Sequence, residues 1–352
     1  MKYLKSIFIM IIFLSFISYI VLGCNNYVIY TSHRIDQGEP VQASVLLYRF
    51  DDAYISLVKK GLEEIEVKNQ GKIKFTFYDG KNDQSVQDEA LDAILNEKKA
   101  DLILLNLVDT RSTKQAIDKI KENNIPVVLF NREPVDIEAI KSYYKSFFVG
   151  TNAREAGIIQ GDILINKWKQ EKNQIDRNKD DVMQYVLLVG EAGNIEAIDR
   201  SKYSVLTINN AGIRTKELGS KVCNWNQEEG KNAMRALLSQ WGNKIEVVIS
   251  NNDSMAIGAI EALQEQGYNN GDKTKMIPIV GVDAIPAAQE LIKEGIMTGS
   301  VLQDPSAMAE ALYLVGMNLA YNRNPLEETD YKFDETGVAV RLPYKEYIVN
   351  QS

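Results

Sequence analysis

The chain contains very little histidine and very little cysteine. Its 352 residues include one histidine, His33, and two cysteines, Cys24 and Cys223. His33 lies in a polar stretch at residues 25–40 that is typical of a tether, so metal sites built on histidine and Ser-His-Asp catalytic triads are excluded. If Cys24 carries a lipid, as the N-terminal signal described below implies, Cys223 is left without a partner, and a secreted enzyme stapled by disulfides is excluded as well. The hydrophobic core has to hold the fold together.

A concentrated basic surface is also absent from the sequence. The 40 Lys and Arg residues are scattered among 48 Asp and Glu residues, which gives a net charge of −8 and a pI near 5.1. No stretch supplies the phosphate-neutralising surface that nucleic acid needs, so DNA or RNA is not an expected partner. Apolar residues make up 45% and charged residues 25% of the chain, which is typical of a globular protein and, at this length, predicts two domains.

A single apolar run marks the N-terminus. Lys2 and Lys5 precede apolar residues 7–22, and Gly23-Cys24 closes the run. The run is short for a bilayer span of about 20 residues, and its order is that of a secretory signal. Its ending resembles the bacterial lipoprotein signal, which implies that Cys24 carries diacylglycerol and becomes the mature N-terminus; an uncleaved anchor helix is the alternative. Both interpretations place the folded part outside the cytoplasm, held to the membrane through the anchor alone.

From residue 41 onward, short apolar runs alternate with longer amphipathic stretches. This alternation is typical of βαβ units and predicts an α/β fold with mostly parallel sheets. Two series of about five units each predict two similar doubly wound domains, and ligands bind such sheets beyond the carboxyl ends of the strands. The expected strands are residues 43–48, 73–78, 102–105, 127–130 and 147–149 in the first series, and 185–189, 213–218, 247–249, 277–282 and 299–302 in the second.

Polar and aromatic residues gather where these expected strands end. Each such segment alone reads as an ordinary turn or helix cap. Their recurrence favours a pyranose site, because carboxylates and amides satisfy vicinal hydroxyls while flat rings cover the apolar C–H face. The segments are Tyr48-Arg49-Phe50-Asp51-Asp52-Ala53-Tyr54, Asn131-Arg132-Glu133-Pro134, Gly190-Glu191-Ala192-Gly193-Asn194, Asn251-Asn252-Asp253 and Gly281-Val282-Asp283.

These segments, with Asn82-Asp83-Gln84-Ser85, Asn106-Leu107-Val108-Asp109 and residues 157–162 and 245–249, resemble the galactose/glucose-binding proteins of ABC uptake systems, within the type I periplasmic binding proteins. The likeness covers residues 41–344. It implies two lobes joined by a three-stranded hinge, with crossings near Gly150, residues 299–303 and Arg341. The implied organisation is a signal at 1–24, a tether at 25–40, a first lobe of 41–150 plus 303–340, and a second lobe of 151–302 plus 341–352.

The resemblance also implies which side chains contact the sugar. Hydroxyls would be held by Asp52 and Asn131 from the first lobe and by Glu196, Arg200, Asn252 and Asp283 from the second. Tyr54 and Trp225 would sandwich the ring, with Tyr48 beside it. Taken alone, Trp225 is better explained as a core tryptophan.

Four positions depart from the family pattern. Their side chains still form hydrogen bonds but differ in reach and charge, and sites built to bond a hydroxyl discriminate strongly. The sugar therefore stays open, with glucose or galactose first and another hexose, a pentose or a glycoside behind. The departures are Asn194 for a histidine at the hydroxymethyl end, Glu196 for an aspartate beside the anomeric hydroxyl, Gln303 for an asparagine and Tyr54 for a phenylalanine.

The loop at residues 176–184 places oxygen-bearing side chains at alternate positions, as a calcium loop does. By spacing alone the match is poor, because the sixth position is Asp181 instead of Gly and the twelfth is not Glu, so a solvated acidic loop is the default. The resemblance implies a structural calcium whose bidentate carboxylate comes from a distant strand, and Asp181 can adopt the positive φ that is needed. The implied ligands are Asp176, Asn178, Asp180, the Val182 carbonyl, Gln184 and Glu246.

Two other classes of protein share part of this pattern. A glycosidase needs two carboxyl groups flanking one bond, and no spacing here picks out such a pair, so no enzyme is expected. A regulator of the sugar-repressor class would begin with a helix-turn-helix, where this chain has a signal. We therefore expect a monomeric, lipid-anchored protein that binds a monosaccharide by hinge closure and delivers it to an ABC permease. A sugar sensor that docks on a chemoreceptor or sensor kinase is the alternative.

Overall fold

The computed structural model describes residues 38–349. The predicted signal, the lipidation site Cys24 and most of the predicted tether lie outside the described residues. No helix within the described range is long and apolar enough to cross a membrane. Both lobes belong to one unit, Ile35–Ser352.

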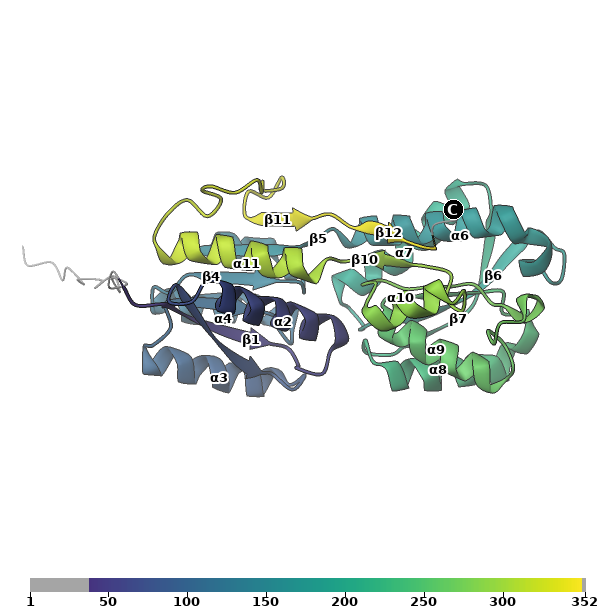
Figure 1. The fold of residues 1–352 in the computed structure, drawn as a ribbon, viewed down its shortest axis with the longest axis horizontal. Helices are drawn as coiled ribbons and strands as arrows, with labels where there is room; N and C mark the ends of the chain where they lie inside the picture. The colour runs from purple at the N-terminus through teal and green to yellow at the C-terminus, as the bar shows by residue number, and fades with distance from the viewer. Residues whose placement is uncertain (1–37, 350–352) are drawn as a thin grey trace, which may run out of the picture. The chain divides into compact units, whose positions relative to one another are not determined.

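The first lobe is built on a six-stranded sheet in the order β11-β5-β4-β3-β1-β2, with every pair parallel (Figure 1). Its central strands are almost entirely apolar, as expected of strands covered on both faces. The strands are β1 (Val41–Leu47), β2 (Ile73–Asp79), β3 (Leu102–Leu105), β4 (Val127–Phe130), β5 (Ser146–Thr151) and β11 (Ala339–Leu342), and the helices are α2 (Ala53–Lys68), α3 (Gln84–Glu97), α4 (Thr113–Glu122), α5 (Ile137–Lys141) and α11 (Pro305–Ala320), with a 3-10 turn, η1, at Thr110–Ser112.

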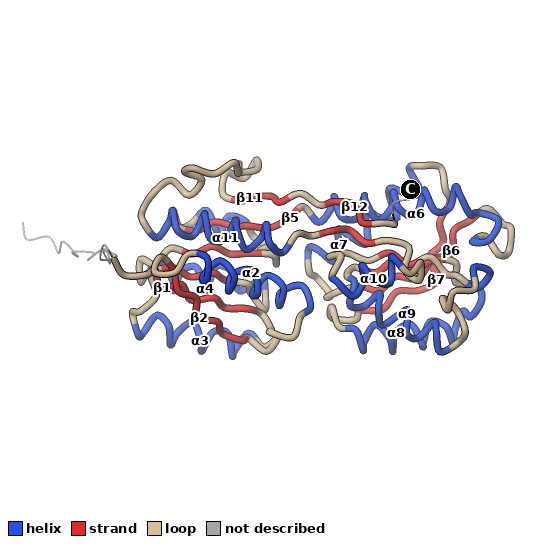
Figure 2. The backbone as a smooth tube through the Cα atoms, in the orientation of Figure 1, coloured by secondary structure: helices blue, strands red, loops and turns tan. Residues whose placement is uncertain are grey.

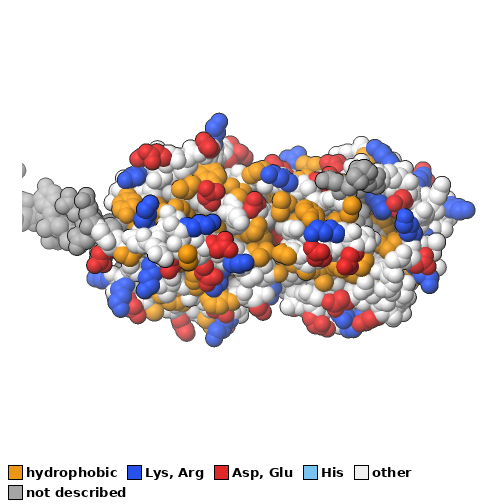
Figure 3. Space-filling view, viewed as in Figure 1, with side chains coloured by type: hydrophobic (Ala, Val, Ile, Leu, Met, Phe, Trp, Pro, Cys, Tyr) orange, Lys and Arg blue, Asp and Glu red, His pale blue; other side chains and the backbone are white. Residues whose placement is uncertain are grey.

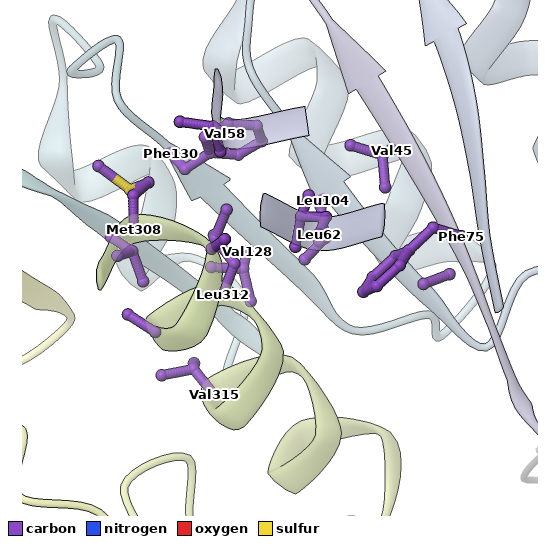
Figure 4. Packing of buried hydrophobic residues seen from close by; sticks show 14 of the residues in the cluster. Val45, Val58, Leu62, Phe75, Leu104, Val128, Phe130, Met308, Leu312 and Val315 are labelled. Atoms are coloured by element: carbon purple, nitrogen blue, oxygen red, sulfur yellow. The ribbon is translucent and has the colours of Figure 1, made fainter. Parts of the chain in front are cut away.

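Helices cover both faces of this sheet. On one face, Leu62 of α2 and Leu312 of α11 pack on Leu104 and Val128 of the central strands, all fully buried (Figure 4). The other face is covered by α3 and α4 in a second apolar cluster. Helix α11 follows the second series of strands in the chain, so its return to this lobe ties the end of the sequence to its beginning.

The second lobe repeats the plan on a four-stranded parallel sheet, β7-β6-β8-β9, which isolated bridges extend toward β10. Helices α6 and α7 cover one face, and α8, α9 and α10 cover the other. The elements are β6 (Val182–Val189), β7 (Arg214–Val222), β8 (Val247–Ser250), β9 (Ile279–Val280), β10 (Ser300–Leu302), β12 (Lys345–Tyr347), α6 (Ala153–Ile175), α7 (Ile195–Asn210), α8 (Gln227–Trp241), α9 (Asp253–Glu265), α10 (Pro286–Lys293) and the 3-10 turns η2 (Gly242–Lys244) and η3 (Lys273–Lys275).

Three connections join the lobes, and they can be followed in Figure 2. They run from β5 to α6, from β10 to α11, and from β11 to β12, which pairs antiparallel with β10. Two lie where the sequence predicts them, near Gly150 and after residue 302. The third begins after Leu342, the last residue of β11, next to Arg341, near which the sequence places it and which pairs with Gly150 inside the first sheet.

Charges of both signs are interspersed over the face seen in Figure 3. This agrees with the scattered Lys and Arg residues of the sequence, and it leaves no basic stripe on that face.

Candidate functional site

A pocket between the two lobes brings together all of the side chains expected to contact a sugar. It encloses about 390 Å³ of empty space, part of it open to solvent. Its lining is Tyr48, Asp52, Tyr54, Ile55, Asn131, Arg132, Asn194, Glu196, Arg200, Trp225, Asn252, Asp283 and Gln303. Sequence reasoning missed Ile55 and Arg132. Ile55 carries no signal, whereas Arg132 stood next to Asn131 in a polar segment after β4 and could have been found there.

Three of the lining residues are helix N-caps. Asp52 Oδ1 accepts hydrogen bonds from the backbone N–H groups of Tyr54 and Ile55 at 3.0 and 2.9 Å. Asn194 and Asn252 cap α7 and α9 in the same way, each at 3.0 Å. The cap interpretation of these residues is therefore right, and it coexists with their place in the pocket, because a cap uses only one oxygen of the side chain.

Three other lining residues have left-handed backbone. Asn131, Trp225 and Asp283 have φ angles of 63°, 59° and 110°. Such conformations cost energy for residues other than glycine, most of all at 110°, and in folded proteins they cluster at functional sites. The fold therefore holds the backbone of these three pocket residues in a costly conformation, which agrees with a functional role for the pocket.

The indole of Trp225 packs directly against Gly190, and the fit depends on the absence of a side chain there. A Cβ on Gly190 would lie 2.2 Å from Cη2 of the indole, far inside normal contact. Trp225 belongs to the apolar core of the second lobe and lines the pocket as well. The core interpretation of this residue is thus right, and the same ring faces the pocket, where the Arg200 guanidinium lies 5.7 Å from its centroid.

Several buried polar atoms of the pocket have no hydrogen-bond partner. A buried polar group is costly unless it is paired, so the lining suits a ligand rich in hydroxyl groups. Among the described residues there are eleven such atoms, and six belong to this one pocket: Tyr54 Oη, Arg132 Nε, Glu196 Oε2, Arg200 Nε, Trp225 Nε1 and Gln303 Nε2.

Burial raises the pKa of two acidic lining residues, Asp283 and Glu196. Burial raises the pKa of Asp283 well above its ordinary value, and the Arg200 guanidinium opposes this shift. Burial likewise raises the pKa of Glu196. Tyr48 donates its hydroxyl proton to Asp52 Oδ2 at 2.5 Å, and burial together with Asp52 raises the pKa of this tyrosine, so the phenol stays neutral.

Hydrogen bonds between the lobes close the rim of the pocket. Arg132 Nη2 donates to Glu191 Oε2 of the second lobe at 2.5 Å and to the Val108 carbonyl at 2.9 Å. The backbone N–H of Glu133 donates to Glu196 Oε1 at 2.7 Å. Arg132 and Glu133 follow β4 of the first lobe, and Glu191 and Glu196 follow β6 of the second, so these two bonds hold the lobes closed on each other.

The predicted calcium loop folds around its carboxylates. Glu246 is 2% exposed and accepts backbone N–H groups of Arg177 and Gln184, both at 2.9 Å. Burial raises the pKa of Glu246 to about 7, and Asp176 adds to this shift. Asp181 has a φ of 63°, the positive φ that a calcium loop needs at this position.

The donor set of this loop suits calcium in part. Gln184 is 4% exposed, and its Oε1 has no hydrogen-bond partner, although its amide nitrogen donates to Asp180 Oδ2 at 2.8 Å. Over residues 38–349, no three His, Cys, Asp or Glu side chains form a group that could hold a metal ion. The expected set has only three carboxylates and depends on amide and carbonyl oxygens for the remainder, which is a donor mixture that calcium accepts.

Known proteins resemble this chain along most of its length. The family described as "Periplasmic binding protein domain" matches residues 43–324. A D-galactose/methyl-galactoside binding periplasmic protein of Haemophilus influenzae is 39% identical over 301 residues, which cover 85% of this chain and 87% of that protein.

Solved structures share the fold. A solute binding protein of an ABC transporter from Bacillus halodurans, with bound myo-inositol, superposes with a TM-score of 0.72 at 23% identity, covering 88% of this chain and 95% of that one. A periplasmic solute binding protein from Actinobacillus succinogenes, with bound D-allose, gives 0.72 at 19% identity, covering 88% and 98%. The chain therefore has the predicted type I fold and belongs to the periplasmic binding protein family, whose members bind solutes and are not enzymes.

Proposed function

We propose that this protein captures a monosaccharide between its lobes and delivers it to an ABC transporter in the membrane, with galactose and glucose as the first candidates. One observation carries the proposal: the pocket gathers six buried polar atoms without partners beside aromatic rings from both lobes. The 39% identical relative is named for D-galactose and methyl-galactoside, and this supports the same class of ligand.

The chemistry of the lining matches a sugar ring. The acceptors are carboxylate oxygens, among them Glu196 Oε2, and the donors are Arg200 Nε, Gln303 Nε2 and Trp225 Nε1. A hydroxyl group both donates and accepts, so vicinal hydroxyls can satisfy neighbouring donors and acceptors at once. The indole of Trp225 supplies the flat apolar surface that the C–H face of the ring needs.

Closure of the lobes is the proposed signal to the transporter. A sugar that contacts both lobes favours the closed arrangement through its differential affinity for that state. The Arg132–Glu191 hydrogen bond between the lobes adds to closure, and its Glu191 side makes no contact with the sugar pocket. The transporter then reads the closed form as occupancy.

We also propose that a structural calcium binds the 176–184 loop. Asp176, Asn178, Asp180, the Val182 carbonyl, Gln184 and Glu246 would hold it. The partnerless buried Gln184 Oε1 supports this set. When bound, the ion would neutralise the clustered carboxylates and tie the loop to β8, next to which Glu246 lies. We expect no role for it in the sugar pocket.

Attachment to the membrane through a lipid on Cys24 is a further part of the proposal. It depends on the signal in the sequence alone. Labelling of cells with a fatty-acid analogue should tag the wild type and not a Cys24→Ser variant. A monomer is expected.

Sugar uptake tests delivery. Cells that lack this protein should lose high-affinity uptake of labelled galactose or glucose, and the wild type should restore it while Asp283→Ala should not. If uptake is unchanged by the deletion and only sugar-evoked signalling is lost, the sensor alternative, docking on a chemoreceptor or sensor kinase, replaces transport.

A further inference from the structure

A tyrosine outside the pocket lining joins the pocket to the hinge. Tyr344 lies on the third connection, between β11 and β12, and is 7% exposed. Its hydroxyl oxygen lies 2.7 Å from Thr151 Oγ1, 2.9 Å from Arg200 Nη2 and 3.2 Å from Gln303 Oε1. Thr151 ends β5 at the first connection, and Gln303 follows β10 at the second. All three connections therefore meet at one oxygen atom, together with a guanidinium of the pocket.

The protons of this cluster can be assigned from its chemistry. Arg200 can only donate, so its Nη2–H groups point to the Tyr344 oxygen and, at 3.2 Å, to Gln303 Oε1. The phenol has one proton, and the acceptor that needs it is Gln303 Oε1, while the Thr151 hydroxyl donates to the phenol oxygen. Gln303 Oε1 thus receives two donors, and this fixes which end of the amide is oxygen.

The assignment determines which hydrogen-bonding groups this corner of the pocket presents to a ligand. Because Oε1 accepts hydrogen bonds from Tyr344 and Arg200, the group of Gln303 that remains for a ligand is Nε2, a buried donor without a partner. Arg200 is restrained in the same way, because Nη1 donates to the Asn251 carbonyl at 2.8 Å and Nη2 to Tyr344, which leaves Nε as its partnerless donor. Both free groups can only donate.

We propose that Tyr344 is a positioning residue for ligand selectivity: its hydroxyl holds Gln303 and Arg200 so that this corner of the pocket offers two donors and selects a ligand oxygen that accepts from them. The inference rests on the proposed function, since it concerns recognition of a sugar in the same pocket. Without the hydroxyl, only the 3.2 Å bond from Arg200 holds Gln303 Oε1, and the amide can turn this oxygen toward the ligand by giving up that one bond.

The test compares selectivity, which a purely structural role would not change. Calorimetry measures the affinity of the full-length mature protein for the tighter of galactose and glucose and for each monodeoxy analogue of that sugar. In the wild type, the analogue that lacks the oxygen at this corner should bind at least about tenfold more weakly than the parent sugar. In Tyr344→Phe, the parent should weaken about tenfold, and the penalty for that one analogue should largely disappear, while the penalties at other positions persist.

Matched variants separate the outcomes. Tyr347→Phe removes a nearby, partly buried hydroxyl at the end of β12, which donates to Gln289 Oε1 at 3.2 Å and not to the pocket, and it should leave every affinity unchanged. Thr151→Val removes one bond to the Tyr344 oxygen and should reproduce the change in selectivity to a smaller extent, which keeps the test open if Tyr344→Phe does not fold. If Tyr344→Phe, or Thr151→Val in its place, weakens all analogues equally or changes nothing, the inference is overturned while the proposed function stands. Absence of sugar binding by the wild type would overturn the proposed function and the inference with it.

Discussion

The space that Gly190 leaves for Trp225 makes a quantitative prediction. In Gly190→Ala the new Cβ would lie 2.2, 2.3 and 2.4 Å from three atoms of the indole. Carbon atoms in contact lie about 3.5 Å apart or more, so the ring has to move by roughly 1 Å. An aromatic anchor in a binding site contributes about 2 kcal/mol. We therefore expect sugar affinity to fall by roughly 10- to 100-fold.

Stability should fall as well, and a neighbouring glycine provides the control. Overpacking of a core typically costs about 1 to 3 kcal/mol of unfolding free energy. Gly193 lies in the same loop with a φ of 81° and nothing within 4 Å of its virtual Cβ. Gly193→Ala should therefore cost about 1 to 2 kcal/mol through backbone strain alone and leave sugar affinity intact.

Calorimetric titration and urea unfolding of both variants would check this reasoning. Equal losses of stability with a loss of affinity only in Gly190→Ala would support it. Wild-type affinity in Gly190→Ala would refute the claim that the indole forms a wall of the sugar site, and equal affinity losses in both variants would attribute the effect to the loop instead of the ring.

Three further predictions follow from the buried charges and from the bridges between lobes. The folded-state pKa of Asp283 is raised above its ordinary 3.8, so the sugar-free wild type should lose stability as the pH rises from that value through the raised pKa, by at most about 1.4 kcal/mol per pH unit. Asp283→Asn should flatten this pH dependence, and denaturant unfolding at several pH values measures the slope. A slope that Asp283→Asn leaves unchanged would show that another group causes it. Glu191→Gln should weaken every sugar of a panel by the same factor, about 3- to 10-fold, because it loses a closure contact and no ligand contact; a change in the ranking of sugars would contradict this. Chelation of calcium should lower the melting temperature of the wild type and not that of Asp176→Ala, which would already lack the ion, as calorimetric scans of both proteins can show; equal responses would argue against the loop.

Much of the fold was predictable because its central strands are continuous apolar runs. Residues 102–105 and 127–130 were expected as strands and form β3 and β4 with those limits. Strand β7 runs from Arg214 to Val222, beyond the expected 213–218, because it lies at a sheet edge where alternating polar residues give no apolar run. Strand β12 was not expected for a similar reason: Lys345–Tyr347 is short and polar, and its pairing with β10 depends on the tertiary fold.

The lining of the pocket was predictable because parallel strands deliver their carboxyl ends to one edge. Asp52 comes five residues after β1 and Asn252 two residues after β8, so topology places each at the carboxyl edge of its own sheet, while the resemblance implied that the two edges face each other. The role of Tyr344 was not predictable, because it arises from the convergence of three connections that are distant in sequence. The rim contact of Arg132 with Glu191 likewise exists only once the lobes close.

The most direct test of the central claim is calorimetric titration of the protein lacking residues 1–24 with galactose, glucose, xylose and a methyl glycoside. We predict saturable one-to-one binding of at least one of these monosaccharides in the micromolar range or tighter, abolished by Asp283→Ala and without any turnover of the glycoside. Silence across the whole panel, or hydrolysis of the glycoside, would contradict the account of this pocket as a monosaccharide site.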